Sequence, residues 1–349
     1  MALRWKWGLA APIVVSAALA AYGQQWNLAG LPAYDPEQHV SGTIRLWGHG
    51  SFKRDFMGTL VKFWEEGFAR YQPEVHFEYR MYGTASSIGA LYAGVGDIAI
   101  RGEEIFPFEV AAFQRVMGFP PFGIEIATGS LDVQNMDYAQ VFFVHKDNPI
   151  SKLTLAQLDA ILGEEHRRGL ENIRTWGELG LQGDWADQPI HLYGWALDDD
   201  FTTYLQGAVL NGSHRWNCRL KEFRRITRAD GSVIDAGQQI LDALATDPYG
   251  IAVSNLRYAN SRVKPLALAA DSGLGYFEPT KENLIERKYP LTRIIPAFIN
   301  RAPNQPIAAK VKEFLRYILS REGQQDIVRE GGYLPLSAEA AREQLRRLE

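Results

Sequence analysis

The sequence predicts an α/β protein of two lobes, each a mostly parallel sheet flanked by helices. Strand-like apolar segments alternate with segments whose apolar residues recur at helical spacing, an order that favours parallel sheets. The 349 residues, 46% of them hydrophobic, are enough for two domains of ~150 residues each. Two long extended runs, 138–149 and 289–300, flank the middle block, so we expect one lobe to be inserted into the other through two crossover strands that form a hinge.

The first lobe begins with a predicted strand over residues 43–47, which breaks into a glycine turn at Gly48 and Gly50. The elements that follow alternate in type. We predict a helix carrying Phe56, Leu60, Phe63, Trp64 and Phe68, a strand from 75, a short helix over 86–94, a strand over 97–100, a helix over 106–118 and a strand from 122.

The second lobe repeats the alternation. Helices are predicted over 155–163, 198–209 and 233–247, with strands over 188–195 and 249–255. After the second extended run, the apolar spacing from Ile307 to Leu319 predicts an amphipathic helix started by Pro306, because proline fits the first helical turn. The predicted boundaries are 41–138 with 292–349 for lobe 1, and 139–291 for lobe 2.

The N-terminus has the pattern of a secretory signal. Arg4 and Lys6 precede an apolar run over residues 9–21, and small residues at 21 and 23 provide a cleavage site. The run is shorter than the ~20 apolar residues that a bilayer requires. We therefore expect a signal peptide at 1–23, a leader segment at 24–40 and a periplasmic protein, with an uncleaved anchor as the alternative.

Composition excludes several classes of function. The formal charge is −4, and loss of residues 1–23 would leave 35 basic and 41 acidic residues, so nucleic acid is not an expected partner. Cys218 is the only cysteine, which rules out an intramolecular disulfide. The sequence lacks a complete GxGxxG, a Gly-Lys-Ser/Thr, an HExxH and a GxSxG, so no cofactor, no metal and no enzymatic activity are expected.

Three aspartates, Asp198, Asp199 and Asp200, precede a helical apolar pattern. Helix starts attract anions through free N–H groups and the macrodipole. Either the aspartates cap the helix, where Asp is favoured, or they line a cleft that prefers a cationic, zwitterionic or polyhydroxylated ligand. Trp195 and Trp216 also have two interpretations: they are core residues, or they are surfaces on which a ligand stacks.

Five stretches follow one another along the chain: "GTIRLWGHGSF", "YGTASSIGALYAGVGDIAI", "TWGELGLQGDWADQPIHLYGW", "DPYGIAVSNLRYA" and the block from "YPLTRIIPAFIN" to "GGYLPLS". In this order they resemble the phosphate-binding proteins that serve ATP-driven importers, and the resemblance covers about residues 41–337. The resemblance implies a two-lobed periplasmic binding protein of type II that closes on a small ligand, a membrane permease of an ABC importer as partner, and a monomer.

In that family, backbone N–H groups at helix starts, hydroxyl groups and an arginine hold the oxyanion. The resemblance places Gly50, Ser51 and Phe52 in the first ligand loop, and Thr84, Ser86 and Ser87 in the second. A tight strand-to-helix turn is the alternative for the first loop, and an N-cap cluster is the alternative for the second.

Two further loops depart from the family pattern. After "DIAI" the chain has Arg101, Gly102, Glu103 and Glu104 instead of a serine-rich turn, and the loop at 198–200 has aspartates where an arginine and small hydroxyl residues are expected. Unit charges at ~4 Å repel by about 4 kcal/mol at an effective dielectric of 20, which opposes tight phosphate binding.

We expect Arg101 to pair with the aspartates across the cleft, with an ion pair to Glu103 or Glu104 as the alternative. The expected function is capture of phosphate or a related oxyanion or organic solute. The alternative is a degenerate homologue that acts as an interaction or sensing subunit.

Overall fold

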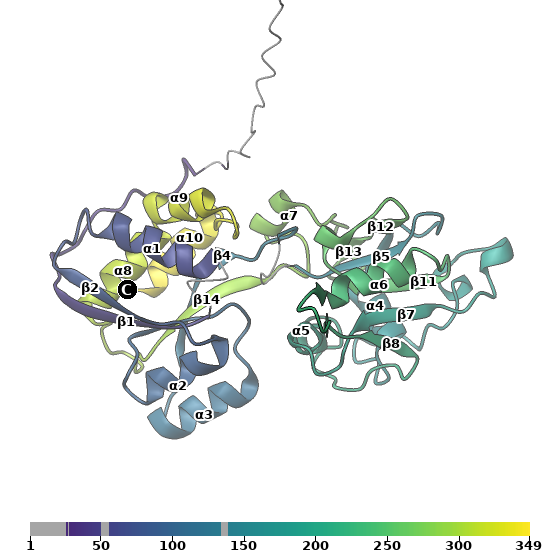
Figure 1. Cartoon of the computed structure of the whole chain (residues 1–349), viewed down its shortest axis with the longest axis horizontal. Coiled ribbons are helices and arrows are strands. Elements are labelled where there is room, and N and C mark those ends of the chain that lie inside the picture. The colour runs from purple at the N-terminus through teal and green to yellow at the C-terminus, as the bar shows by residue number, and fades with distance from the viewer. Residues whose placement is uncertain (1–25, 27, 50–55, 134–138) are drawn as a thin grey trace, which may run out of the picture.

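The computed structural model describes residue 26 and residues 28–49, 56–133 and 139–349. These residues form two lobes that lie side by side and are joined through the ends of β4 and β14 (Figure 1). Lobe 1 contains β1 (Gly42–Gly48), α1 (Phe56–Phe68), β2 (Val75–Arg80), η1 (Thr84–Ser86), α2 (Ser87–Tyr92), β3 (Ile98–Ile100), α3 (Pro107–Met117), β4 (Phe122–Thr128), β14 (Ile294–Ile299), α8 (Ala309–Leu319), α9 (Arg321–Glu330) and α10 (Ala338–Arg347).

Lobe 2 is formed by the middle of the chain. Its elements are β5 (Val141–His145), β6 (Lys152–Thr154), α4 (Leu155–Leu162), η2 (Gly177–Leu179), η3 (Gly183–Trp185), β7 (His191–Trp195), α5 (Asp200–Ala208), β8 (Leu220–Phe223), β9 (Ile226–Thr227), β10 (Val233–Ile234), α6 (Ala236–Leu244), β11 (Gly250–Ser254), η4 (Leu256–Tyr258), β12 (Val263–Pro265), β13 (Ala267–Ala269) and α7 (Lys281–Ile285).

Each lobe has one five-stranded sheet, ordered β2-β1-β3-β14-β4 in lobe 1 and β12-β5-β11-β7-β8 in lobe 2. In lobe 1 only β14 is antiparallel to its neighbours, and in lobe 2 only β5 is. These are the strands by which the chain enters each lobe from the other, so they run against the rest. The prediction of mostly parallel sheets is confirmed, and the remaining strands of each lobe end at the edge that faces the other lobe.

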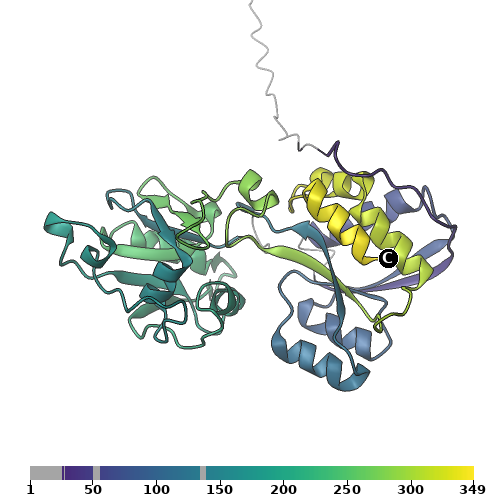
Figure 2. The ribbon, with the colours of Figure 1, turned by 180° about the vertical axis from the view of Figure 1, so that it is seen from behind.

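Helices cover both faces of the lobe 1 sheet. In Figure 1, α1, α8, α9 and α10 lie on one side and α2 and α3 on the other, and Figure 2 shows the C-terminal helices from behind. Trp64, Phe68 and Phe314 fill the larger core of this lobe, while Phe113 belongs to a smaller cluster beneath α2 and α3. Two large cores, one per lobe, let each sheet bury its apolar residues without the other.

Local signals explain several element ends. Thr154 and Gln157 form a reciprocal capping box at the start of α4, and Gly331 ends α9 with φ 85°, a left-handed conformation that glycine adopts without strain. The helix predicted to start at Pro306 begins instead at Ala309, because Ala308 has an extended backbone with ψ 127°. The predicted start was therefore three residues too early.

The leader residues pack onto lobe 1 as a loop. Leu31 and Tyr34 join its core, and the Tyr34 hydroxyl donates to Glu313 at 2.8 Å. Within the described ranges, none of the helices has the length and apolar character needed to cross a bilayer. The apolar run at 9–21 lies outside the described residues.

The two crossing segments are tied together where they leave lobe 1. The Gly129 N–H donates to the Arg293 carbonyl at 2.9 Å, and Thr128 exchanges two backbone hydrogen bonds with Leu334 at 2.8 and 2.9 Å. On the lobe 2 side, the Asn255 amide donates to the Leu131 carbonyl at 2.7 Å. The chain therefore passes between the lobes twice, and the two crossing segments are hydrogen-bonded to each other at Gly129 and Arg293.

Candidate functional site

The parallel strands of each lobe end at the edge that faces the other lobe, and α/β proteins bind ligands in the loops that follow such strand ends. In lobe 1 they follow β1, β2 and β3, and in lobe 2 they follow β7 and β11. The close approach of β1 to β3 needs Gly48, because its φ is +142° and a Cβ there would lie 1.8 Å from the Ile100 carbonyl oxygen. Gly50, Ser51 and Phe52 lie outside the described residues, so their predicted contacts stay predictions.

The second loop holds its hydroxyl groups against its own backbone. The Ser86 hydroxyl donates to the Gly83 carbonyl at 2.8 Å, and the Ser87 hydroxyl donates to the Thr84 carbonyl at 2.7 Å. The Thr84 hydroxyl lies 3.1 Å from Nδ1 of His49. No side chain caps η1 or α2, so the interpretation of these residues as an N-cap cluster is wrong.

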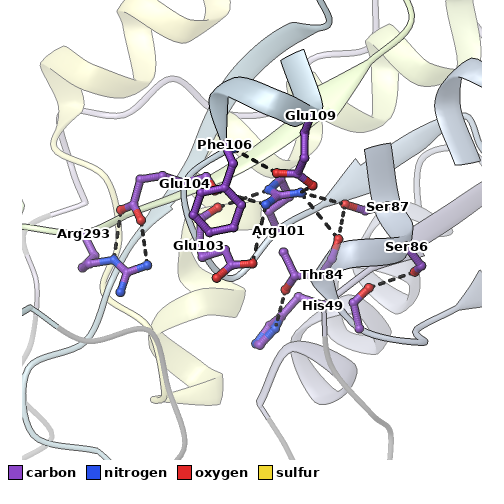
Figure 3. A network of polar contacts seen from close by, with 11 residues as sticks. His49, Thr84, Ser86, Ser87, Arg101, Glu103, Glu104, Phe106, Glu109 and Arg293 are labelled. Atoms are coloured by element: carbon purple, nitrogen blue, oxygen red, sulfur yellow. Dashed lines mark hydrogen bonds and ion pairs between the residues drawn. The ribbon is translucent and has the colours of Figure 1, made fainter. Parts of the chain in front are cut away.

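Arg101 is buried in lobe 1, with none of its side chain exposed. Its guanidinium pairs with Glu109 at 2.7 Å, lies 3.6 Å from Glu103, and donates to the Glu104 carbonyl at 3.0 Å (Figure 3). Nη1 also lies 3.4 Å from the Ser87 hydroxyl. The expected ion pair with the aspartates of lobe 2 is therefore wrong, because these partners occupy the guanidinium within its own lobe.

The Arg101 network organises two loops. Glu109 accepts both from Arg101 and from the Phe106 N–H at 2.9 Å, so one carboxylate fixes the guanidinium and the first turn of α3. The alternative pairing with Glu103 is present at the longer distance, but as a buried contact rather than a surface one. The Arg101 guanidinium, which was predicted to be a ligand contact, therefore holds its neighbouring loops in place instead.

The aspartate loop caps its helix. The Asp199 carboxylate accepts from the Phe201 N–H at 3.0 Å as the N-cap of α5, and Asp200 is the first helical residue. Asp198 points to Arg224, at 2.6 Å, and both side chains are exposed. The pKa values of the two carboxyl groups shift in opposite directions. The hydrogen bond from Arg224 lowers the pKa of Asp198. Burial, together with the charges of Asp200 and Asp198, raises the pKa of Asp199.

Arg293 is a site residue that sequence reasoning missed. It lies where the second crossing enters β14, and only 1% of it is exposed. Nε and Nη2 donate to the two carboxylate oxygens of Glu104 at 2.9 and 2.7 Å (Figure 3). Its guanidinium also lies 4.6 Å from the ring centroid of Tyr204 and 5.7 Å from that of Phe201.

Arg293 therefore connects a lobe 1 loop, the hinge and the start of α5 in lobe 2. The sequence contained one signal for it, a charge inside the apolar run "PLTRIIPAF". Trp195 and Trp216 are 4% and 8% exposed, so both are core residues of lobe 2 rather than open stacking surfaces.

Known proteins are similar to this chain in sequence and in fold. Residues 36–322 match the family described as PBP superfamily domain. The phosphate-binding protein PstS of Pseudomonas aeruginosa is 30% identical over 320 residues, which are 91% of this chain and 90% of that protein.

Solved structures agree on the fold. PstS of Borrelia burgdorferi has a TM-score of 0.57 at 15% identity, over 85% of this chain and 100% of that chain. An ABC-type phosphate transport receptor of Vibrio cholerae has a TM-score of 0.52 at 16% identity, over 84% and 100%. The expected type II binding-protein fold is confirmed. This chain belongs to the PBP superfamily, within the family of phosphate-binding proteins that includes PstS.

Proposed function

We propose that this chain is an exported solute-binding protein that captures phosphate, or a closely related oxyanion, between its lobes and delivers it to the permease of an ABC importer. Family membership and the PstS relative support the ligand class and the transporter partner. The N-terminal signal pattern supports export to the periplasm. In this proposal the protein acts as a monomer and catalyses no reaction.

The observation that carries the proposal is the position of Arg293. A guanidinium binds an oxyanion through two parallel N–H donors, which form a fork. At the junction of the two lobes, Arg293 directs this fork to the Glu104 carboxylate. Because the usual arginine is missing from the lobe 2 loop, Arg293 is the cation that we assign to the ligand. Glu104, whose side chain is 38% exposed, holds the fork in its place until an oxyanion competes for it.

The remaining ligand contacts come from backbone and hydroxyl groups. We assign the Thr84 and Ser86 hydroxyl groups to the ligand, and not the N–H groups of Ser86 and Ser87, which already donate to the Gly83 and Thr84 carbonyls. We keep Ser51, the Phe52 N–H and Ser87 as proposed ligand contacts.

The charge of the aspartate loop opposes the ligand less than the sequence implies. Asp198 is paired with Arg224, and Asp199 is engaged with the helix start. Exposed charges are also screened by salt, with a Debye length of about 8 Å at physiological ionic strength. Asp200 is the carboxylate of this loop for which we assign no balancing contact, and it sets the remaining repulsion.

Closure follows from differential binding. A ligand that contacts the loops of both lobes binds the closed form more tightly than the open form, and so shifts the hinge equilibrium toward closure. Arg293 is well placed to couple the two events because it already touches Glu104 on one side and the rings of Phe201 and Tyr204 on the other.

A thermal-shift titration with inorganic phosphate tests the proposal, since a ligand that binds only the folded state raises the unfolding temperature. We expect a saturable rise with phosphate and a smaller one with sulfate at equal concentration. Calorimetry then gives the affinity and the stoichiometry. No shift at millimolar phosphate would support the degenerate homologue that acts as an interaction or sensing subunit.

A further inference from the structure

A cavity lies in lobe 2, at the edge of the sheet that faces away from lobe 1. Its volume is about 570 Å³, within the range of ~300–1,000 Å³ typical of small-molecule sites. It is formed by the segment after α4 and the segment before β8. Because β8 is parallel to β7, its first residues lie at the amino ends of the strands, opposite the candidate site.

The cavity is lined by polar side chains with a cationic surplus. Arg174 and Arg219 line it together with His166, and Glu164 is the one carboxylate in the lining. Among the described residues, neither guanidinium has a carboxylate within ion-pair distance. The nearby Arg167 and Arg215 differ, because both pair with Glu165, at 2.8 and 3.6 Å. The charge of Arg167 and Arg215 is thus neutralised next to the cavity, whereas the Arg174 charge is balanced in part by Glu178, which accepts from the Arg174 N–H at 2.7 Å.

Two buried polar atoms of the lining lack partners in the part of the chain that the structure describes. They are Nε2 of His166 and Oδ1 of Asn172. Folded proteins give nearly all such atoms a hydrogen-bond partner. Neither atom is exposed in this conformation, so each side chain has to turn toward the cavity to donate to a bound anion, and the Asn172 amide also has to present its nitrogen. His166 is also held at φ 46°, a conformation that is uncommon for a residue other than glycine.

We propose that this cavity binds a small organic phosphate through Arg174, Arg219 and His166. The tetrahedral phosphoryl group offers oxygens in three directions, which suits three donors spread over the segment after α4 and the segment before β8, whereas a carboxylate offers two oxygens in one plane. The volume accommodates an organic group beyond the phosphate. This site is independent of the one between the lobes.

Cys218 makes the site testable. It is the only cysteine of the chain, it is exposed, and it lines the cavity. In the full-length mature protein, we would measure the rate of Cys218 modification by a thiol reagent against glycerol 3-phosphate concentration, with glycerol as the neutral control. We expect saturable slowing of at least about fivefold, because bound anion covers the thiol and disfavours its thiolate.

Variants locate the effect. Arg174→Ala and Arg219→Ala should each weaken protection by about tenfold to a hundredfold in apparent affinity, the range for losing a charge-assisted hydrogen bond. Arg228→Ala, on the exposed β9–β10 hairpin, should protect as the wild type does. Arg293→Ala should also protect normally, which separates this site from the one between the lobes. Absence of protection, or full protection in both cavity variants, would overturn the proposal.

Discussion

Two loops at the lobe-facing ends of parallel strands carry an ion pair each, and the pairs are placed in opposite ways. After β3, Arg101 is completely buried against Glu109, with 0% and 10% of their side chains exposed. After β7, Asp198 meets Arg224 in solvent, with 70% and 62% exposed. The first pair holds loops in place, whereas we propose that the second adjusts the charge near the ligand.

Burial explains this difference. A buried guanidinium loses its hydration and must keep its partner, so removing either member leaves an uncompensated charge. An exposed pair retains its water and is screened by salt, so it contributes little to folding. The same two kinds of side chain therefore form a stabilising pair in lobe 1 and, in our proposal, a pair that tunes the charge of the aspartate loop in lobe 2.

The largest expected effect comes from breaking the buried pair. Arg101→Met should lower the free energy of unfolding by about 3–5 kcal/mol, because Glu109 would remain buried without its cation. Urea denaturation measures this. The double variant Arg101→Met/Glu109→Leu should recover part of the loss. A single variant as stable as the wild type would contradict a structural role for Arg101.

Arg293 is the next most sensitive position. Arg293→Ala should weaken phosphate binding by about tenfold to a hundredfold, as expected for losing charge-assisted hydrogen bonds. Arg293→Lys should fall between the alanine variant and the wild type, because lysine keeps the charge but not the fork. Calorimetry measures both. Unchanged affinity in Arg293→Ala would remove this residue from the site.

Exchanging Asp198, Asp199 and Asp200 for Gly, Ser and Thr tests the tuning role directly. Phosphate affinity should rise by about tenfold at low salt, and the gain should shrink at high salt because screening weakens the repulsion. Titrations at two ionic strengths measure this. If the affinity stays constant, the aspartates do not act on the ligand.

The pH dependence of Asp199 sharpens the contrast within this loop. Burial raises the pKa of Asp199, so the folded protein holds that proton more tightly than the unfolded chain does, and protonation adds stability as the pH falls through the raised pKa. Asp199→Asn keeps a capping side chain but cannot titrate. Its stability advantage over the wild type should be largest at neutral pH and should shrink toward about pH 4. Denaturation at both pH values checks the sign.

The smallest effect belongs to the exposed pair. Arg224→Ala should leave the unfolding midpoint unchanged, because both partners are in solvent. The same variant should slightly weaken phosphate binding, because Asp198 then loses its balancing charge. A clear fall in the unfolding midpoint would show that the exposed pair also contributes to stability, and would contradict the comparison.

Periodicity predicted the fold well because it is a local property. The alternation of strands and helices, the parallel sheets and the double crossing are all readable from apolar spacing. The short strands β6, β8 to β10, β12 and β13 were not predicted, since two to four residues give too little pattern, and β10 occupies the first residues of the helix predicted over 233–247. The helices α7, α9 and α10 were not predicted either. The first residue of α8 was also misplaced, because proline marks a compatible start rather than the start itself.

The charged contacts were harder to predict. Glu109 is the third residue of α3, where a glutamate commonly accepts from the N-cap N–H, so its bond to Phe106 could be predicted locally, although its bond to Arg101 could not. The contact of Arg293 with Glu104 joins residues 189 positions apart, which no local pattern contains. The pairing of Asp198 with Arg224 likewise depends on the position of β8 beside β7.

The radius of gyration in solution, measured by small-angle X-ray scattering with and without phosphate, tests capture between the lobes most directly. The account predicts a saturable decrease on adding phosphate to the wild type, as the two lobes close on the ligand, and a decrease that needs more phosphate in Arg293→Ala. A radius that stays constant at phosphate concentrations where calorimetry shows the protein to be saturated would contradict it.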